Sequence, residues 1–172
     1  MRFHFRCLLL CLSVATLVLL LSTKGSADES VWRTKIGVSA AIQNSQMDIV
    51  LPIWLNADAV LAPSFGMTSI GDKATDTRII GMLRVNLKKG TAVPYVGFRG
   101  GVLTVSPKGG ESVSDVIFGP AFGGEYFFNE HFSAGVEAQL NIVKSGKESS
   151  RFGNPGRTNM NTATAALVTF YF

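Results

Sequence analysis

The stretch TAALVTFYF, residues 164–172, decides the fold of this chain. It carries no charge and ends on an aromatic residue. Because the side chains of a β-strand alternate between two faces, one face of this stretch is apolar throughout. That face holds Ala166, Val168, Phe170 and Phe172. A soluble sheet rarely turns such a face to water, so the stretch predicts a terminal strand whose outer face contacts lipid.

The same alternation, broken by turn residues, runs from Trp32 to the carboxy-terminus, with no amphipathic helical stretch of useful length. The strand expected at 131–143 shows it most clearly, because its apolar and polar residues separate onto opposite faces. In all, the pattern predicts eight strands, at residues 32–42, 47–55, 59–69, 77–87, 92–105, 115–127, 131–143 and 162–172.

Charge distinguishes the two faces of these strands. One face is apolar and uncharged, as at Ile49, Ile79 and Val136. The opposite face is rich in Gly, Ser and Ala, and it carries Lys35, Arg84, Arg99, Glu125 and Glu137. A soluble barrel or sandwich would show the reverse, with its apolar side chains enclosed. The sequence therefore predicts the all-β class, as an eight-stranded antiparallel up-and-down transmembrane β-barrel with a polar lumen.

The lengths of the links and the positions of the aromatic residues predict a barrel whose two ends differ. The links near 56–58, 88–90 and 129–130 are tight, and those near 43–46, 70–76, 106–114 and 144–161 are expected to be mostly longer. Aromatic residues beside the tight turns predict one interfacial girdle. The girdle residues are Trp32, Trp54, Tyr95, Tyr126, Phe127, Phe128, Phe132, Tyr171 and Phe172. Pro52, Pro63 and Pro120 fall inside strands, where they would mark bulges.

The amino-terminus has the three parts of a secretory signal peptide. Arg2 and Arg6 precede an apolar run of about fifteen residues, and small residues stand before Asp28. The run is shorter than the roughly 20 residues that a spanning helix needs. We therefore expect a signal peptide at 1–27 and one barrel domain at 28–172.

Removal of that segment changes the composition. The chain has 16 Lys and Arg against 12 Asp and Glu, and three of the basic residues lie within 1–27. The remainder is nearly neutral, which argues against a nucleic-acid partner. Cys7 and Cys11 also leave, so neither a disulfide nor a cysteine metal site is expected. No cofactor is predicted.

The whole mature chain resembles the small eight-stranded outer-membrane barrels of the OmpA, OmpX and opacity-protein class. The stretch FGPAFGGEYFFNEHFSAGVEAQLN, residues 118–141, is the most similar part. The resemblance implies an outer-membrane location and a monomer surrounded by outer-membrane lipid and lipopolysaccharide. It also implies that Phe170 and Phe172 are the signal read by the barrel-assembly machinery.

The inward charges predict a closed lumen. An eight-stranded barrel is just wide enough for its side chains to fill, and buried charges need partners. We therefore expect Arg84 to pair with Glu125 and Arg99 with Glu137, with Lys35 joining them. The alternative is a gated ion path through the same residues.

The segment near 144–161 is the longest link and has an excess of basic residues. They are Lys144, Lys147, Arg151 and Arg157, against one acid, Glu148. Such side chains bind phosphate well, so this loop could face lipopolysaccharide. An ordinary solvated loop is the alternative. Adhesion or ligand capture could also reside here, since loops on a rigid scaffold commonly carry function.

An enzyme is a third possibility, because some barrels of this size modify lipid A with a His, a Ser and an acid. His131, Ser133 and Glu137 superficially suggest such a triad. His131 is expected at a tight turn, whereas the other two point into the lumen, which argues against catalysis. The sequence thus favours a non-enzymatic barrel with a structural or surface-interaction role.

Overall fold

The computed structural model describes residues 35–44 and 46–172. The proposed signal peptide and Trp32 lie outside these residues. Within them, no helix is long and apolar enough to cross a membrane. The strands of this described part are β1 (Gly37–Gln43), β2 (Gln46–Val50), β3 (Ile53–Trp54), β4 (Ala59–Ile70), β5 (Ala74–Asn86), β6 (Ala92–Pro107), β7 (Val113–Phe127), β8 (Phe132–Lys144) and β9 (Thr158–Tyr171).

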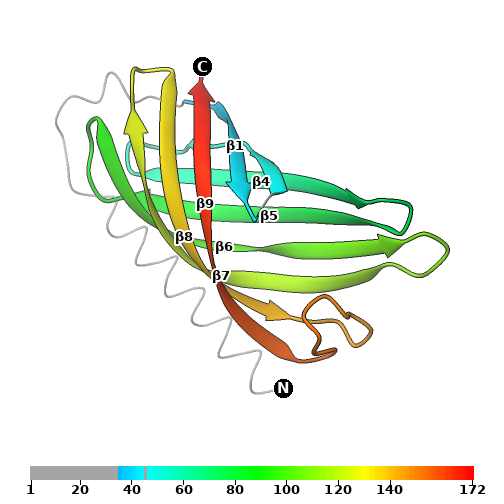
Figure 1. Cartoon of the computed structure of the whole chain (residues 1–172). Helices are drawn as coiled ribbons and strands as arrows, with labels where there is room; N and C mark the ends of the chain where they lie inside the picture. The colour runs from blue at the N-terminus through cyan, green and yellow to red at the C-terminus, as the bar shows by residue number, and fades with distance from the viewer. Residues whose placement is uncertain (1–34, 45) are drawn as a thin grey trace.

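The strands form one closed antiparallel barrel (Figure 1). Neighbours in sequence pair with one another, and β1 pairs with β9, from Gly37 opposite Tyr171 to Ile42 opposite Ala166. Pairing of both β2 and β3 with β4 completes the circle. β2 and β3 together occupy the position of one strand, so the barrel has the eight strand positions that the sequence predicts. The predicted fold class is confirmed.

The prolines interrupt hydrogen bonding without shifting the register. Pro52 separates β2 from β3 because it has no N–H to donate, yet Leu51 N still donates to Pro63 O and Gly37 N to Pro52 O. The pairs Ile49–Phe65 and Ile53–Leu61 keep one register against β4. The β7–β8 register is likewise unchanged across Pro120. The bulges expected at these two prolines are therefore absent.

Solvent exposure alternates along the strands as the sequence predicts. In β5, Ile79 is 62% exposed and Ile80 only 4%. Large apolar side chains stand on the outer face of every long strand, among them Phe65, Phe98, Phe122, Val136 and Val168. We call this outer surface the apolar belt. Arg84, Arg99, Glu125 and Glu137 are all buried on the inside.

The links at the two ends of the barrel differ in length, although less than expected. One end, here called the turn end, holds links 55–58, 87–91 and 128–131 and the carboxy-terminus (Figure 1). The other, the loop end, holds links 44–45, 71–73, 108–112 and 145–157. The prediction of mostly longer links at this end was wrong for the first three. β4 to β7 continue outward as hydrogen-bonded strands through residues that are polar enough to resemble a loop.

Of the nine predicted girdle residues, eight lie in the described part of the chain, and four of these eight lie inside the barrel. Trp54, Tyr95, Phe127 and Tyr171 are buried. The exposed aromatic side chains near the turn end are Tyr126, Phe128, Phe132, Phe170 and Phe172. The sequence argument grouped residues by closeness to a turn and ignored strand parity, which sends neighbours such as Tyr126 and Phe127 to opposite faces.

Candidate functional site in the barrel lumen

Aromatic and aliphatic side chains close the lumen at the turn end. The buried cluster consists of Trp54, Val60, Val93, Phe127 and Tyr171. Phe127 stacks on Tyr171 with ring centroids 5.6 Å apart, and Trp54 meets both rings edge-on. Rings in these orientations pack densely, and the cluster brings together side chains from five strands.

The Arg84–Glu125 ion pair lies directly beside this aromatic cluster. Arg84 Nη2 and Glu125 Oε2 are 2.6 Å apart, and both side chains are buried. Glu125 Oε1 also accepts hydrogen bonds from Ser133 Oγ (2.6 Å) and the Tyr171 hydroxyl (2.8 Å). The Arg84 guanidinium packs over the Tyr95 ring, 4.5 Å from its centroid. The structure thus brings together two residues that the sequence placed two strands apart, and adds polar partners that it did not identify.

The second expected pair does not form. Glu137 accepts hydrogen bonds from the Tyr95 hydroxyl (2.9 Å) and from Gln139 Nε2 (2.7 Å). No ion pair joins it to Arg99, although both side chains lie in the described part of the barrel. Tyr95 reaches Glu137 past Gly123, where a Cβ would lie only 2.7 Å from the tyrosine oxygen. A phenol from β6 therefore takes the place that the sequence assigned to an arginine.

A further ion pair crosses the lumen closer to the loop end. Arg78 donates to Asp48 Oδ1 from Nε (3.0 Å) and Nη2 (2.7 Å). The pair passes over Gly66, where a Cβ would collide with the Asp48 carboxylate. Neither residue is among the predicted site residues. Alternation could have found them, because Asp48 precedes the outward Ile49 and Arg78 precedes the outward Ile79.

Arg151 connects the 145–157 link to two strands at the loop end. It lies in the 145–157 link, yet Nη1 and Nη2 donate to the two oxygens of Asp76 (2.7 and 2.9 Å), and Nε donates to Asp115 (3.2 Å). The adjacent Phe152 packs against the buried cluster that contains Ile117 and Val143. Burial alone would lower the pKa of Arg151, but its hydrogen bonds and the charges of both aspartates outweigh burial and raise it. The link is therefore folded inward over the lumen.

The other predicted site residues lie at the two ends. Lys35 Nζ donates to the Glu130 carbonyl at the turn end (2.7 Å), away from the Arg84–Glu125 pair. Phe170 and Phe172 are exposed, with their rings edge-to-face at 5.3 Å. At the loop end, Lys144, Lys147 and Arg157 are exposed. Arg151, expected among these outward-facing residues, is the one that turns inward.

His131 and Ser133 have separate partners. His131 Nδ1 lies 3.0 Å from the Tyr171 carbonyl oxygen, and Nε2 lies 3.5 Å from Glu130. Ser133 is buried and donates to Glu125. A catalytic serine would instead donate to the histidine, so the described geometry contains no His131–Ser133 base–nucleophile pair. Across the described residues, no group of His, Cys, Asp and Glu is arranged to hold a metal ion.

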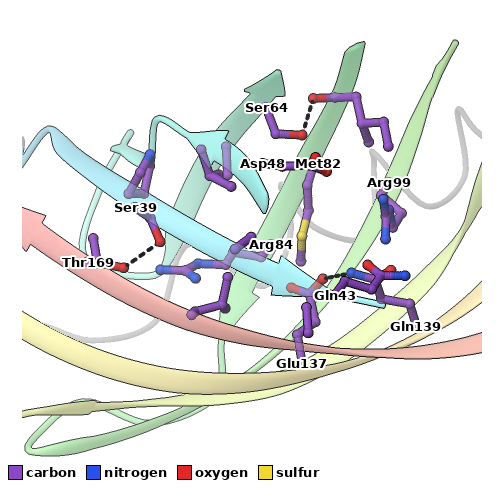
Figure 2. Close-up of a pocket in the computed structure, with 17 residues that line it drawn as sticks. Ser39, Gln43, Asp48, Ser64, Met82, Arg84, Arg99, Glu137, Gln139 and Thr169 are labelled. Atoms are coloured by element: carbon purple, nitrogen blue, oxygen red, sulfur yellow. Dashed lines mark hydrogen bonds between the residues drawn. The ribbon is translucent and has the colours of Figure 1, made fainter. Parts of the chain in front are cut away.

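A cavity of about 60 Å³ remains between the charged layers (Figure 2). Its polar lining includes Ser39, Asp48, Arg99, Glu137 and Gln139. Ser39 and Thr169 are hydrogen-bonded across β1 and β9 at 3.0 Å. Buried side chains thus lie on both sides of a polar cavity.

Comparison with known proteins adds evidence for the fold. The barrel superimposes on the crystal structure of Neisserial surface protein A with a TM-score of 0.53, covering 81% of this chain and 94% of that one at 14% identity. The chain has the fold of an outer-membrane β-barrel. The β-barrel domain of Pseudomonas aeruginosa OprF gives a TM-score of 0.47 at 17% identity, covering 81% of this chain and 96% of that one. No protein-family model matches the sequence, and no curated protein matches it significantly.

Proposed function

We propose that this protein is a non-enzymatic outer-membrane barrel with a closed lumen, of the OmpA, OmpX and opacity-protein type. Residues 1–27 act as its cleaved signal peptide. The observation that carries the proposal is the apolar belt, which surrounds a barrel whose charged side chains point inward. Such a surface is stable only where lipid replaces water around it.

Side chains at both ends support a closed lumen. The aromatic cluster fills the turn end, and Arg151 holds the 145–157 link across the loop end through Asp76 and Asp115. Between them, Arg84 is paired with Glu125 and Arg78 with Asp48. The role of the protein then resides in its outer surface. The exposed Lys144, Lys147 and Arg157 provide positive charge that can contact lipopolysaccharide phosphates or an acidic ligand.

A narrow pore is the second candidate, because the middle of the lumen is hollow and polar. Recordings in planar lipid bilayers separate the two functions. The closed barrel should show no steady conductance, since an ion would have to displace paired buried charges. Arg151→Ala should remain silent as well, because the aromatic cluster still blocks the turn end. Stable channels formed by the wild-type protein would contradict the closed lumen and support the pore function.

Deletion of Phe172 should impair assembly. Phe172 is 71% exposed and makes a ring contact with Phe170, so its loss removes the proposed signal without opening the lumen. We expect less folded protein in the outer membrane and more unfolded protein in the periplasm, with unchanged secretion. Cell fractionation with protease shaving measures this. Phe128→Ala, which alters another exposed aromatic residue at the turn end, serves as the matched control. Normal insertion of the truncated chain would show that the terminal residue is incidental.

A further inference from the structure

Arg99 is a buried cation that makes no ion pair within the described residues, although the charges of Glu137 and Asp48 act on it at longer range. Its side chain extends from β6 into the lumen and is 7% exposed. Nη1 has no hydrogen-bond partner among residues 35–44 and 46–172. The other inward arginines, Arg78, Arg84 and Arg151, are all ion-paired. A buried guanidinium nitrogen without a hydrogen bond is costly, so the site favours an additional hydrogen-bond acceptor.

An unpaired acceptor lines the same cavity. The Gln139 amide donates from Nε2 to Glu137 Oε1, which fixes the orientation of the amide because a carboxylate can only accept. Gln139 Oε1 is then left buried without a donor in the described residues. The described residues that line the cavity therefore include two guanidinium nitrogens without a hydrogen bond, Arg99 Nη1 and Arg84 Nε, and one acceptor without a donor, Gln139 Oε1 (Figure 2).

The cavity has room for a ligand and lies beside the lowest part of the barrel wall. Its volume of about 60 Å³ compares with the roughly 10–15 Å³ that a single water requires on the same measure. The barrel wall is lowest at the β1–β2 hairpin, because β9 continues outward from Ala165 to Thr158 without a partner on β1. Gln43 and Asp48 stand at this low edge and also line the cavity (Figures 1 and 2).

We propose that this cavity is a binding site for a small protonated oxyanion, of the hydrogen phosphate or bicarbonate class. Its charged oxygens accept from Arg99, and its hydroxyl group can donate to Gln139 Oε1. Chloride has no proton to donate, and water brings no negative charge. Asp48 and Glu137 also line the cavity, but they already accept hydrogen bonds from Arg78, Tyr95 and Gln139, which disfavours a metal cation there. Binding at this site is independent of the surface role proposed above.

Titration calorimetry of the folded mature barrel in detergent tests the site with inorganic phosphate as the probe. Saturable binding is expected for the wild type. Bicarbonate should compete, and chloride should not. Arg99→Met should weaken phosphate binding at least about tenfold, because it removes a charge-assisted hydrogen bond. Arg99→Lys keeps the charge and should bind more weakly than the wild type but more tightly than Arg99→Met. If Arg99→Met does not fold, Arg99→Lys alone provides the comparison with the wild type.

Lys73→Met is the matched control, because it removes an exposed cation from the 71–73 link, outside the basic surface proposed above. Its phosphate affinity should equal that of the wild type. The heat-dependent shift in gel mobility verifies that each variant is folded. Absence of saturable binding in the wild type would mean that the cavity holds only water and would overturn the proposal. Equal weakening by Arg99→Met and Lys73→Met would overturn it too, because nonspecific attraction by surface charge would then explain the binding.

Discussion

Loss of Glu125 should destabilise the folded barrel by about 3–5 kcal/mol. The substitution Glu125→Ala leaves the buried Arg84 with only the Tyr171 hydroxyl, at 3.3 Å, and the face of the Tyr95 ring. Arg84→Met should be less harmful, since Glu125 would keep the hydroxyl groups of Ser133 and Tyr171 as donors. The free energy of unfolding, from urea titrations of the barrel in lipid vesicles, measures both effects.

The double variant Arg84→Met, Glu125→Ala should recover part of the loss, because neither charge is then left alone. The exposed pair Lys108–Asp72, joined at 2.7 Å in the loop-end links, provides the comparison. A double-mutant cycle on Lys108 and Asp72 should show no measurable coupling free energy, since water screens the two charges. Strict additivity at Arg84 and Glu125 would contradict a functional ion pair in the lumen.

Val136→Arg should destabilise the inserted barrel by about 2–4 kcal/mol. Val136 is 62% exposed on the apolar belt, in the turn-end half of β8 opposite Ala166 of β9. An arginine there would have to be dehydrated by lipid, and no acid lies on the belt to pair with it. Folding into lipid vesicles, followed by the heat-dependent gel shift, measures the change.

Met160→Arg is the control for depth in the membrane. Met160 is equally exposed on β9, but it pairs with Ile142 near the loop end of β8. An arginine near the interface can reach water, so the destabilisation should fall to roughly 0–1 kcal/mol. Equal losses at both positions would show that the belt has no lipid-buried centre.

The sequence predicted the barrel because period-two alternation fixes which side chains point outward. The same alternation also explains the features that were predicted wrongly or missed. Tyr95 and Tyr171 were assigned to the girdle from their nearness to turns, although alternation directs both inward. Strand ends were less predictable, because hydrogen-bonded strands that continue past the belt have loop-like composition. Pro52 divides a strand without changing its register, a distinction that composition does not reveal.

The lumen was only partly predictable. Alternation places Arg84 and Glu125 inside, but contact between strands two apart depends on side-chain length and on what lies between them. Tyr95 reaches Glu137 first, so Arg99 is left unpaired. The inward fold of Arg151 had no local signal. Its partners Asp76 and Asp115 lie 75 and 36 residues away in the sequence, and only the closed barrel brings the three together.

Spin-label accessibility along β5 tests the central claim, that the belt faces lipid. Without residues 1–27 the sequence has no cysteine, so single cysteines can be placed at residues 79 to 83 and labelled cleanly. In vesicles, labels at Ile79, Gly81 and Leu83 should be accessible to oxygen, which partitions into lipid, and shielded from a water-soluble nickel reagent. Labels at Ile80 and Met82 should be poorly accessible to oxygen. If the nickel reagent reached 79, 81 and 83 freely, the belt would face water and the outer-membrane assignment would be wrong.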